Sequence, residues 1–287
     1  MIATQIAAVV VMYHPEISFL KNIATYADQV TRLFIIDNSE FPDEDFYKSF
    51  RSDPKVVIIS DKINHGIAKA LNIAGEKAKQ EGFDWLLTMD QDSSFDPGVL
   101  SAYFQAADAY PAKEAVAVFG LPYDKEFLSS RPADEFYVEV NSLITSGCLL
   151  NLQLFEKLEG FNEKLFIDEV DHDYCYRAIL SGYKVVVIKA GLMRHTLGRS
   201  LELTNKRNLS SGLKTLHNPI RIYYIVRNGL YVSGKFKNEF PKESAKRRKI
   251  IYVTVKNNLL YGDQKLAVLK YAILGLWHNV IKRYGRF

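Results

Sequence analysis

The stretch Leu86-Leu87-Thr88-Met89-Asp90-Gln91-Asp92-Ser93 decides the fold of this chain. An apolar run from Trp85 to Met89 ends abruptly in two carboxylates, Asp90 and Asp92. Such a run is typical of a strand buried in a parallel sheet, and open α/β sheets bind ligands at the carboxyl ends of their strands. Adjacent carboxylates repel each other unless a cation compensates them. Because divalent cations prefer hard oxygen ligands and substrate phosphates, the stretch predicts a metal-assisted site for a phosphorylated substrate.

The acidic pair has three other interpretations. A loop Asp pair is often only solvated, or caps the helix that follows. The residues at 90, 92, 94 and 96 imitate the start of an EF-hand loop, but Phe95 and Ser101 stand where that loop needs Gly and Glu. An Asp-x-Asp after a strand is also the nucleophile motif of haloacid-dehalogenase-like phosphatases. That motif normally ends the first strand of its domain, whereas at least three strand-like runs come earlier here.

Strand-like and helix-like segments alternate along the first part of the chain. The pattern predicts strands at 5–12, 30–36, 56–60, 85–89 and 115–119, with helices at 16–28, 66–80 and 97–109. This alternation predicts an α/β fold with a doubly wound, mostly parallel sheet, and right-handed crossovers bring Tyr13, Asp37, Asp61 and Asp90 to one edge. The absence of G-x-G-x-x-G after the first strand argues against an NAD-type site.

Charge divides the chain into two parts. Residues 1–193 contain 17 Lys and Arg and 29 Asp and Glu, a net charge of −12, whereas residues 194–287 contain 20 and 4, a net charge of +16. After residue 194 the strand pattern fades, and segments 217–233 and 245–283 have the pattern of basic, amphipathic helices that also carry aromatic residues. Basic charge with aromatics suits nucleic acid, an anionic membrane surface or a solvated face. No nucleic-acid motif is present, so we favour the membrane surface.

Composition limits the class of protein. Only two cysteines occur, Cys148 and Cys175, which predicts small buried thiols, no disulfide framework and a reducing, cytoplasmic compartment. No charge-free apolar run approaches the roughly 18 residues of a membrane-spanning helix. The N-terminus has no basic segment of the kind that begins a signal peptide.

Further polar clusters follow the predicted strands. Asn64-His65-Gly66 precedes a helix whose N-terminal amides suit an anion. Thr145-Ser146-Gly147-Cys148 follows an alternating run, and an acidic segment at 166–173 leads into Tyr174-Cys175-Tyr176-Arg177. A purely structural interpretation of the acidic segment is a helix N-terminus, where the helix dipole stabilises the negative charges.

In the order and spacing of these motifs the chain resembles the family 2 inverting glycosyltransferases of the GT-A fold. Within that family it is most similar to bacterial rhamnosyltransferases of cell-surface polysaccharide and O-antigen assembly. The resemblance spans roughly residues 5–230. The matching motifs are Asp37-Asn38-Ser39, Asn64-x-Gly66-Ile67-Ala68 with Asn72, Met89 to Ser93, Ser146-Gly147, Phe166 to Arg177, His195-x-x-Gly198, and His217-Asn218-Pro219 through Arg221-x-Tyr223-Tyr224 to Arg227-Asn228.

The resemblance implies a role for each matching residue. Asp37 contacts the nucleobase, Asp92 binds Mg²⁺ or Mn²⁺, and Asp90 lies near both the ribose and the metal. His195 is a further ligand of the metal or of the diphosphate. The residues expected at the acceptor or diphosphate are Ser146, Gly147, Arg194 and Arg227. Arg221 and Arg227 are expected to bind diphosphate or lipid phosphate, or only to cap helices. The residues expected in the nucleotide-sugar pocket are Tyr13, Asp37, Asn38, Asn64, Gly66, Ile67, Asn72 and Asp90.

Two aspartates compete for the role of general base. Asp171 matches the aspartate that has this role in the family's E-D motif, but Val170 stands where the acidic partner is usual. Asp168 is the form seen in rhamnosyltransferase-like members. An attacking hydroxyl must lose its proton to a carboxylate, so both aspartates remain open at this point.

The expected function is inverting transfer of a sugar, L-rhamnose from dTDP-β-L-rhamnose, onto a lipid-linked glycan. The enzyme is expected on the cytoplasmic face of the inner membrane, held peripherally and without nucleic acid; a homodimer is left open. Alternatives are a UDP-sugar-dependent galactosyl-, galactofuranosyl- or N-acetylhexosaminyltransferase, the phosphatase, and an inactive sugar-nucleotide-binding scaffold. The expected domains are a catalytic part at 1–200, with a nucleotide-binding half at 1–120 and an acceptor half at 121–200, and a basic helical part at 201–287.

Overall fold

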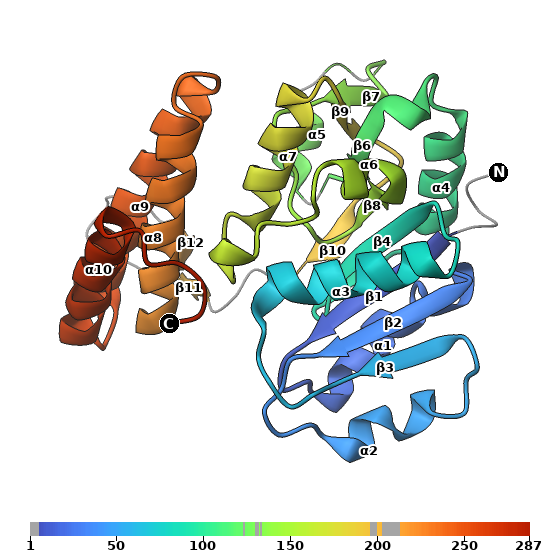
Figure 1. Ribbon diagram of the computed structural model, residues 1–287, viewed down its shortest axis with the longest axis horizontal. Helices are drawn as coiled ribbons and strands as arrows, with labels where there is room; N and C mark the ends of the chain where they lie inside the picture. The colour runs from blue at the N-terminus through green and yellow to red at the C-terminus, as the bar shows by residue number, and fades with distance from the viewer. Residues whose placement is uncertain (1–5, 123, 130–131, 133, 196–199, 203–212) are drawn as a thin grey trace. The chain divides into compact units, whose positions relative to one another are not determined.

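The computed structural model describes residues 6–122, 124–129, 132, 134–195, 200–202 and 213–287. The chain divides into two compact units (Figure 1). The first comprises residues 1–166 and 170–195, and the second comprises residues 167–169 and 196–287. The expected fold class is confirmed, because the first unit is a mostly parallel α/β sheet and helices form the C-terminal part. The roles predicted for 1–120, 121–200 and 201–287 stay predictions.

The first unit is built on an eight-stranded sheet with the order β3-β2-β1-β4-β8-β6-β9-β7. The first four of these strands are mutually parallel, β8 is antiparallel to both of its neighbours, and β6 and β9 are parallel. The strands are β1 Ile6–Met12, β2 Arg32–Asp37, β3 Val56–Ile59, β4 Trp85–Asp90, β6 Val116–Gly120, β7 Tyr137–Glu139, β8 Cys148–Asn151 and β9 Lys184–Ile188. A separate antiparallel pair joins β5 Ser93–Phe95 to β10 Met193–His195.

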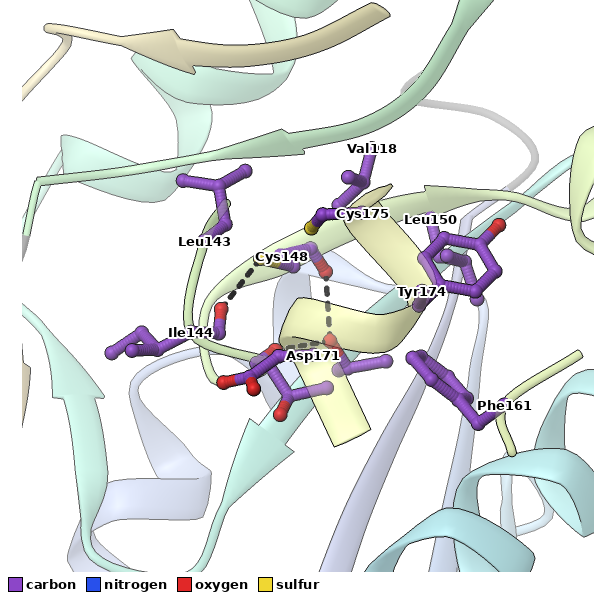
Figure 2. Close-up of a pocket in the computed structure, with 11 residues that line it drawn as sticks. Val118, Leu143, Ile144, Cys148, Leu150, Phe161, Asp171, Tyr174 and Cys175 are labelled. Carbon is purple, nitrogen blue, oxygen red and sulfur yellow. Dashed lines mark hydrogen bonds between the residues drawn. The ribbon is translucent and has the colours of Figure 1, made fainter. Parts of the chain in front are cut away.

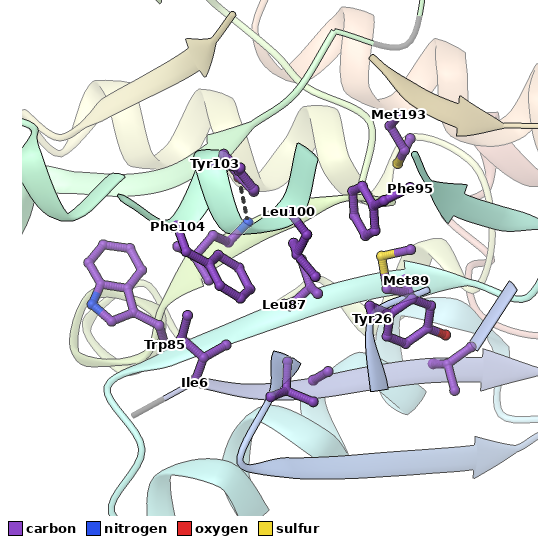
Figure 3. Close-up of a cluster of buried hydrophobic side chains, with 14 of the residues drawn as sticks. Ile6, Tyr26, Trp85, Leu87, Met89, Phe95, Leu100, Tyr103, Phe104 and Met193 are labelled. Carbon is purple, nitrogen blue, oxygen red and sulfur yellow. Dashed lines mark hydrogen bonds between the residues drawn. The ribbon is translucent and has the colours of Figure 1, made fainter. Parts of the chain in front are cut away.

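Helices cover both faces of this sheet. The helix α3 runs along β1, β2 and β4 (Figure 1). Alternate residues of β1 (Ile6, Ala8, Val10 and Met12) join the main core on the other face, together with Tyr103 and Phe104 of α4. Figure 3 shows this core, in which the Tyr103 hydroxyl accepts a hydrogen bond from the Leu149 amide of β8. The helices are α1 Leu20–Ala24, α2 Glu44–Tyr47, α3 Gly66–Gln80, α4 Val99–Ala109, α5 Lys125–Ser129, α6 Leu152–Lys157 and α7 Val170–Leu180.

One predicted helix of this unit is broken. Segment 16–28 forms a short 3-10 turn at Ile17–Phe19, α1, and a second turn at Ala27–Gln29. The Thr25 hydroxyl donates to the Asn22 carbonyl and accepts from the Phe95 amide. A side chain that bonds nearby backbone in this way competes with the helix, and Tyr26 then turns fully into the core.

The second unit contains three helices, α8 Pro219–Lys235, α9 Pro241–Tyr261 and α10 Lys265–Val280, with the hairpin of β11 Ser200–Glu202 and β12 Leu213–Thr215. The expected helix at 245–283 is therefore two helices, separated at Gly262, whose amide bonds the Asn258 carbonyl and ends α9. The Asn218 side chain caps α8, and Pro219 occupies its first turn. No described helix is long and apolar enough to cross a bilayer.

Candidate active site at the carboxyl edge of the sheet

Parallel register brings the polar strand ends together. Asp37 lies opposite Met12 at the ends of β2 and β1, and Asp90 lies opposite Val11 at the end of β4. Tyr13, Asp37 and Asp90 therefore share one edge of the sheet, where the right-handed crossovers place them. Open α/β sheets bind their ligands at this edge.

Gln91 links two of these strand ends and was not singled out in the sequence. Its side-chain oxygen accepts from the Tyr13 amide at 2.9 Å, and its side-chain nitrogen donates to the Tyr13 carbonyl at 3.3 Å. Asn22 donates to the Gln91 carbonyl at 3.0 Å. The Gln between the two aspartates thus fixes the turn that carries them; the sequence signal was its position inside the acidic motif.

Asp37 is buried, with one oxygen used within the protein. Its Oδ1 accepts from the Ser39 amide at 2.8 Å, and its Oδ2 is buried. The Tyr47 phenol lies nearby, and its pKa is raised first by burial and then by the charge of Asp37. A contact of Asp37 with a nucleobase stays a prediction.

The N-terminus of α3 is ordered by the predicted asparagines. The Asn64 side chain accepts from the Gly66 amide at 2.9 Å, and the Asn38 side chain donates to the Gly66 carbonyl at 3.2 Å. Gly66 has φ +78°, and a Cβ there would lie 2.4 Å from the carbonyl oxygen of Phe166. That same carbonyl accepts from the Ile67 amide at 2.7 Å. The first amides of α3 are therefore used to hold Asn64 and Phe166, whereas the sequence predicted that they suit an anion.

Asn72 is occupied within the fold. Its side-chain oxygen accepts from the Phe161 amide at 2.8 Å, and its nitrogen donates to the Phe161 carbonyl and to Glu163 at 2.9 and 3.0 Å. Asn72 thus ties α3 to the loop that precedes α7. A direct nucleotide contact stays a prediction.

The predicted metal ligands provide two carboxylates. Among the residues that the structure describes, no group of three or more His, Cys, Asp or Glu is placed to hold a metal ion. Two carboxylates nevertheless fit Mg²⁺ or Mn²⁺, since Mg²⁺ is usually held by one or two carboxylates together with substrate phosphates and water. The backbone of His195 pairs with Ser93 beside Asp92, but the His195 side chain and Gly198 lie outside the described residues. Arg194 forms an exposed ion pair with Asp96 at 2.6 Å.

The loop before β8 contacts the acidic turn. The Ser146 hydroxyl accepts from the Asp90 amide at 3.0 Å, and the Gly147 amide donates to the Thr88 carbonyl at 2.8 Å. Gly147 has φ +72°, and a Cβ there would lie 2.3 Å from the Met193 sulfur. The predicted Ser146-Gly147 pair therefore sets the backbone around Asp90.

Asp171 reaches the same region from the first turn of α7. It lines a small pocket with Thr88, Thr145 and Cys148 (Figure 2). The pKa of the Cys148 thiol is raised well above its usual range, mainly by burial and further by the charges of Cys175, Asp171 and Asp90. The pocket thus joins Asp171 of α7 to Thr88 of β4, the strand that ends in Asp90, although the two segments are far apart in the sequence.

The Asp171 carboxylate is oriented by the next residue. Its Oδ1 accepts from the His172 amide at 2.8 Å and lies 2.7 Å from the ring nitrogen Nδ1 of His172. Asp173, by contrast, is fully buried and paired with Arg177 at 2.7 Å. Arg177 also donates to the carbonyls of Leu158 and Gly160, so Asp173 holds the loop rather than facing a ligand.

Two predicted residues belong to the second unit. Asp168 contacts Arg221 at 3.1 Å, and the Arg227 guanidinium is fully buried. Arg227 donates to Asn228, to the Tyr223 hydroxyl and to the Gly285 carbonyl. We therefore leave Arg227 out of the proposed phosphate-binding residues.

The sheet, its acidic edge and the ordered Asn-Gly turn are features of a GT-A-like nucleotide-sugar fold. Residues 8–176 match glycosyl transferase family 2, and the chain belongs to this family. Over 279 residues the chain is 27% identical to "dTDP-rhamnosyl transferase RfbF" of Shigella flexneri, covering 91% of this chain and 90% of that protein. A solved structure, "Crystal structure of GalNAc-T7 with UDP, GalNAc and Mn2+", superposes with a TM-score of 0.54 at 11% identity, over 67% of this chain and 44% of that one. At that identity the likeness shows the fold alone.

Proposed function

We propose that this glycosyltransferase moves L-rhamnose from dTDP-β-L-rhamnose, with inversion, onto a lipid-linked glycan. The observation that supports the proposal is that Asp90 ends β4 at the carboxyl edge of the sheet, while Asp171 lines a pocket together with Thr88 of the same strand. The choice of donor rests on the similarity to a protein described as a dTDP-rhamnosyl transferase over nine tenths of both chains. Membership of glycosyl transferase family 2 disfavours the phosphatase alternative.

The residues have distinct roles in the proposed reaction. Asp37, at the carboxyl end of β2, accepts the ring N–H of a pyrimidine base. Asp90 and Asp92 would hold Mg²⁺ or Mn²⁺, which stabilises the negative charge that develops on the departing diphosphate. Asp171 accepts the proton of the acceptor hydroxyl as that oxygen bonds the anomeric carbon from the face opposite the diphosphate. The bond between the anomeric carbon and the diphosphate oxygen breaks, and dTDP leaves.

We assign the base to Asp171 because it lies in the same unit as Asp90 and lines the pocket beside Thr145. Asp168 is paired with Arg221 instead.

The donor is tested by transfer to a membrane lipid extract. Purified protein with Mn²⁺ receives dTDP-rhamnose, UDP-galactose, UDP-galactofuranose or UDP-N-acetylglucosamine, and products are resolved by mass spectrometry. We expect rhamnosyl product from dTDP-rhamnose alone. Product from a UDP-sugar instead would establish the runner-up donor class, and donor binding without turnover in every extract would favour an inactive scaffold.

We also propose that the second unit holds the enzyme on the cytoplasmic face of the membrane. The basic residues Lys246, Arg248 and Lys249 of α9 are exposed. Apolar side chains are exposed on the same unit, including Tyr252 at 65%, Leu266 at 85% and Trp277 at 56%. Basic charge next to exposed apolar side chains matches an anionic lipid surface, which would also carry the lipid-linked acceptor.

A further inference from the structure

The segment that leads into α7 has an unusual backbone. Phe166, Asp168 and Glu169 have positive φ angles of 57°, 61° and 68°, although none of them is glycine. Non-glycine residues rarely adopt this conformation, and it persists only where surrounding contacts determine it. Such contacts exist on both sides of the segment.

The upstream end is held by α3. The Phe166 carbonyl accepts from the Ile67 amide at 2.7 Å. The Phe166 carbonyl oxygen also lies where a Cβ on Gly66 would stand. The peptide group between Phe166 and Ile167 is therefore held in place by α3.

The next three residues, Ile167 to Glu169, form what we call the acidic strap, and the second unit holds it. The Asn228 side chain of α8 donates to the Ile167 carbonyl at 2.6 Å and to the Asp168 carbonyl at 3.4 Å. Asn228 is fully buried. Arg221, also on α8, contacts Asp168 at 3.1 Å. Asn228 thus holds the backbone of the strap, and Arg221 holds the Asp168 side chain.

An ion pair joins Glu169 to Arg247. Arg247 Nε lies 3.0 Å from Glu169 Oε2, and the two side chains are only 19% and 7% exposed. Arg247 is flanked on α9 by Lys246 and Arg248, which are exposed. A buried carboxylate needs a charged partner, and removing one partner is strongly destabilising locally. Arg247 therefore forms a partly buried ion pair, whereas its basic neighbours face solvent.

The strap continues directly into α7, whose first residue is Val170 and whose second is Asp171. We propose that Arg247 and Asn228 are positioning residues, which fix the backbone of the strap and, through the peptide bond from Glu169 to Val170, the first turn of α7 that carries Asp171. The inference rests on the proposed function in taking Asp171 as the base. It makes Asp168 and Glu169 anchors of the strap.

The first test needs no substrate. Hydrogen exchange of the 164–172 peptide is compared in the wild type, Arg247→Ala, and Lys242→Ala, an exposed residue near the start of α9. We expect faster exchange at 167–171 in Arg247→Ala only. Exchange equal to the wild type would show that Arg247 does not hold the strap, and would overturn the inference even if no sugar is transferred.

The second test separates positioning from folding. We expect Arg247→Ala and Glu169→Gln to lower kcat about 10- to 100-fold, the scale of a small misplacement of a reacting group. The dissociation constant for dTDP should stay within about twofold, because Asp37 and Asp92 are unchanged. Asn228→Asp, which keeps an oxygen but loses the donor, should behave likewise. Arg247→Lys should recover part of the kcat.

Two outcomes would overturn the inference while leaving the proposed function intact. One is an unchanged kcat in Arg247→Ala and Glu169→Gln, with rhamnosyl transfer normal. The other is a parallel loss of kcat, dTDP affinity and Tm, which is the signature of a merely structural pair. If the wild type itself transfers no sugar, the proposed function fails, and the exchange experiment still decides whether Arg247 holds the strap.

Discussion

At the scale of single residues, the base assignment makes the sharpest prediction. Asp171→Asn keeps the size of the side chain and its contact with His172 but cannot accept the acceptor proton. We expect kcat to fall by about 10²- to 10⁴-fold, the usual range for a lost general base, while the dissociation constant for dTDP is unchanged. Asp168→Asn should lower kcat far less than Asp171→Asn does, because Asp168 contacts Arg221 in the strap and is not the proposed base. If Asp168→Asn abolishes turnover and Asp171→Asn does not, the assignment is reversed.

Two buried thiols predict how stability depends on pH. Burial raises the pKa of Cys175 to about 12 and that of Cys148 well above its usual range. Above about pH 9 the unfolded chain loses these protons while the folded protein keeps them, so the free energy of unfolding falls as pH rises. Each thiol contributes about 1.4 kcal/mol per pH unit. Denaturant titrations from pH 8 to 10 should show the fall, and it should be reduced in the Cys148→Ala, Cys175→Ala variant.

At the scale of elements, the turn after β4 carries the metal prediction. Asp92→Ala removes one of two carboxylates, so we expect dTDP binding to weaken markedly and to lose its dependence on Mn²⁺. A chelator should weaken binding to the wild type in the same way. Calorimetric titrations measure both, with the exposed Asp134→Ala as a control. Equal affinity in all of these samples would refute the metal role of Asp92.

The elements also show what the sequence could and could not predict. The helix at Gly66–Gln80 was predicted residue by residue, because small apolar residues recur on one face and the Asn64 turn precedes it. The strand β8 escaped prediction, because Cys148–Asn151 is four residues long and α6 follows it at once. Segment 16–28 was predicted as one helix because periodicity does not reveal that Thr25 bonds the Asn22 carbonyl.

Some features of the candidate site were also predictable from the sequence, and others were not. Asp37, Asp90 and Tyr13 were placed at one edge from topology alone, and the register agrees. The hydrogen bonds from Gln91 to Tyr13 and from Asn72 to Phe161 join residues that are distant in the sequence. No local sequence pattern predicts such contacts. The same holds for Arg227, whose charge suggested phosphate although its donors bond internal oxygens.

At the scale of the whole molecule, the charge division predicts binding to anionic vesicles. Each basic residue near an anionic surface contributes roughly 1 kcal/mol, so replacing Lys246, Arg248 and Lys249 by Gln should weaken vesicle affinity about 10²-fold. Arg247 is left in place because it binds Glu169. Co-sedimentation should show binding of the wild type to anionic but not neutral vesicles, weaker at high salt.

A matched control replaces three exposed lysines of the acidic unit, Lys21, Lys77 and Lys157, by Gln. This variant should sediment like the wild type, and both variants should bind dTDP normally. Equal sedimentation of all three proteins would contradict the membrane prediction and leave folding or dimerisation as the role of the basic helices.

The order of strands in the sheet has a consequence for synthesis. The strands β1 to β4 pair with one another through short crossovers, so most of their partners leave the ribosome close together. The other edge of β4 waits for β8, which begins only at Cys148. Unpaired apolar edges promote aggregation, and distant pairings form slowly. A nascent chain that stalls between Asp90 and Cys148 would therefore expose the apolar run of β4, and chaperones should bind the protein most at that stage.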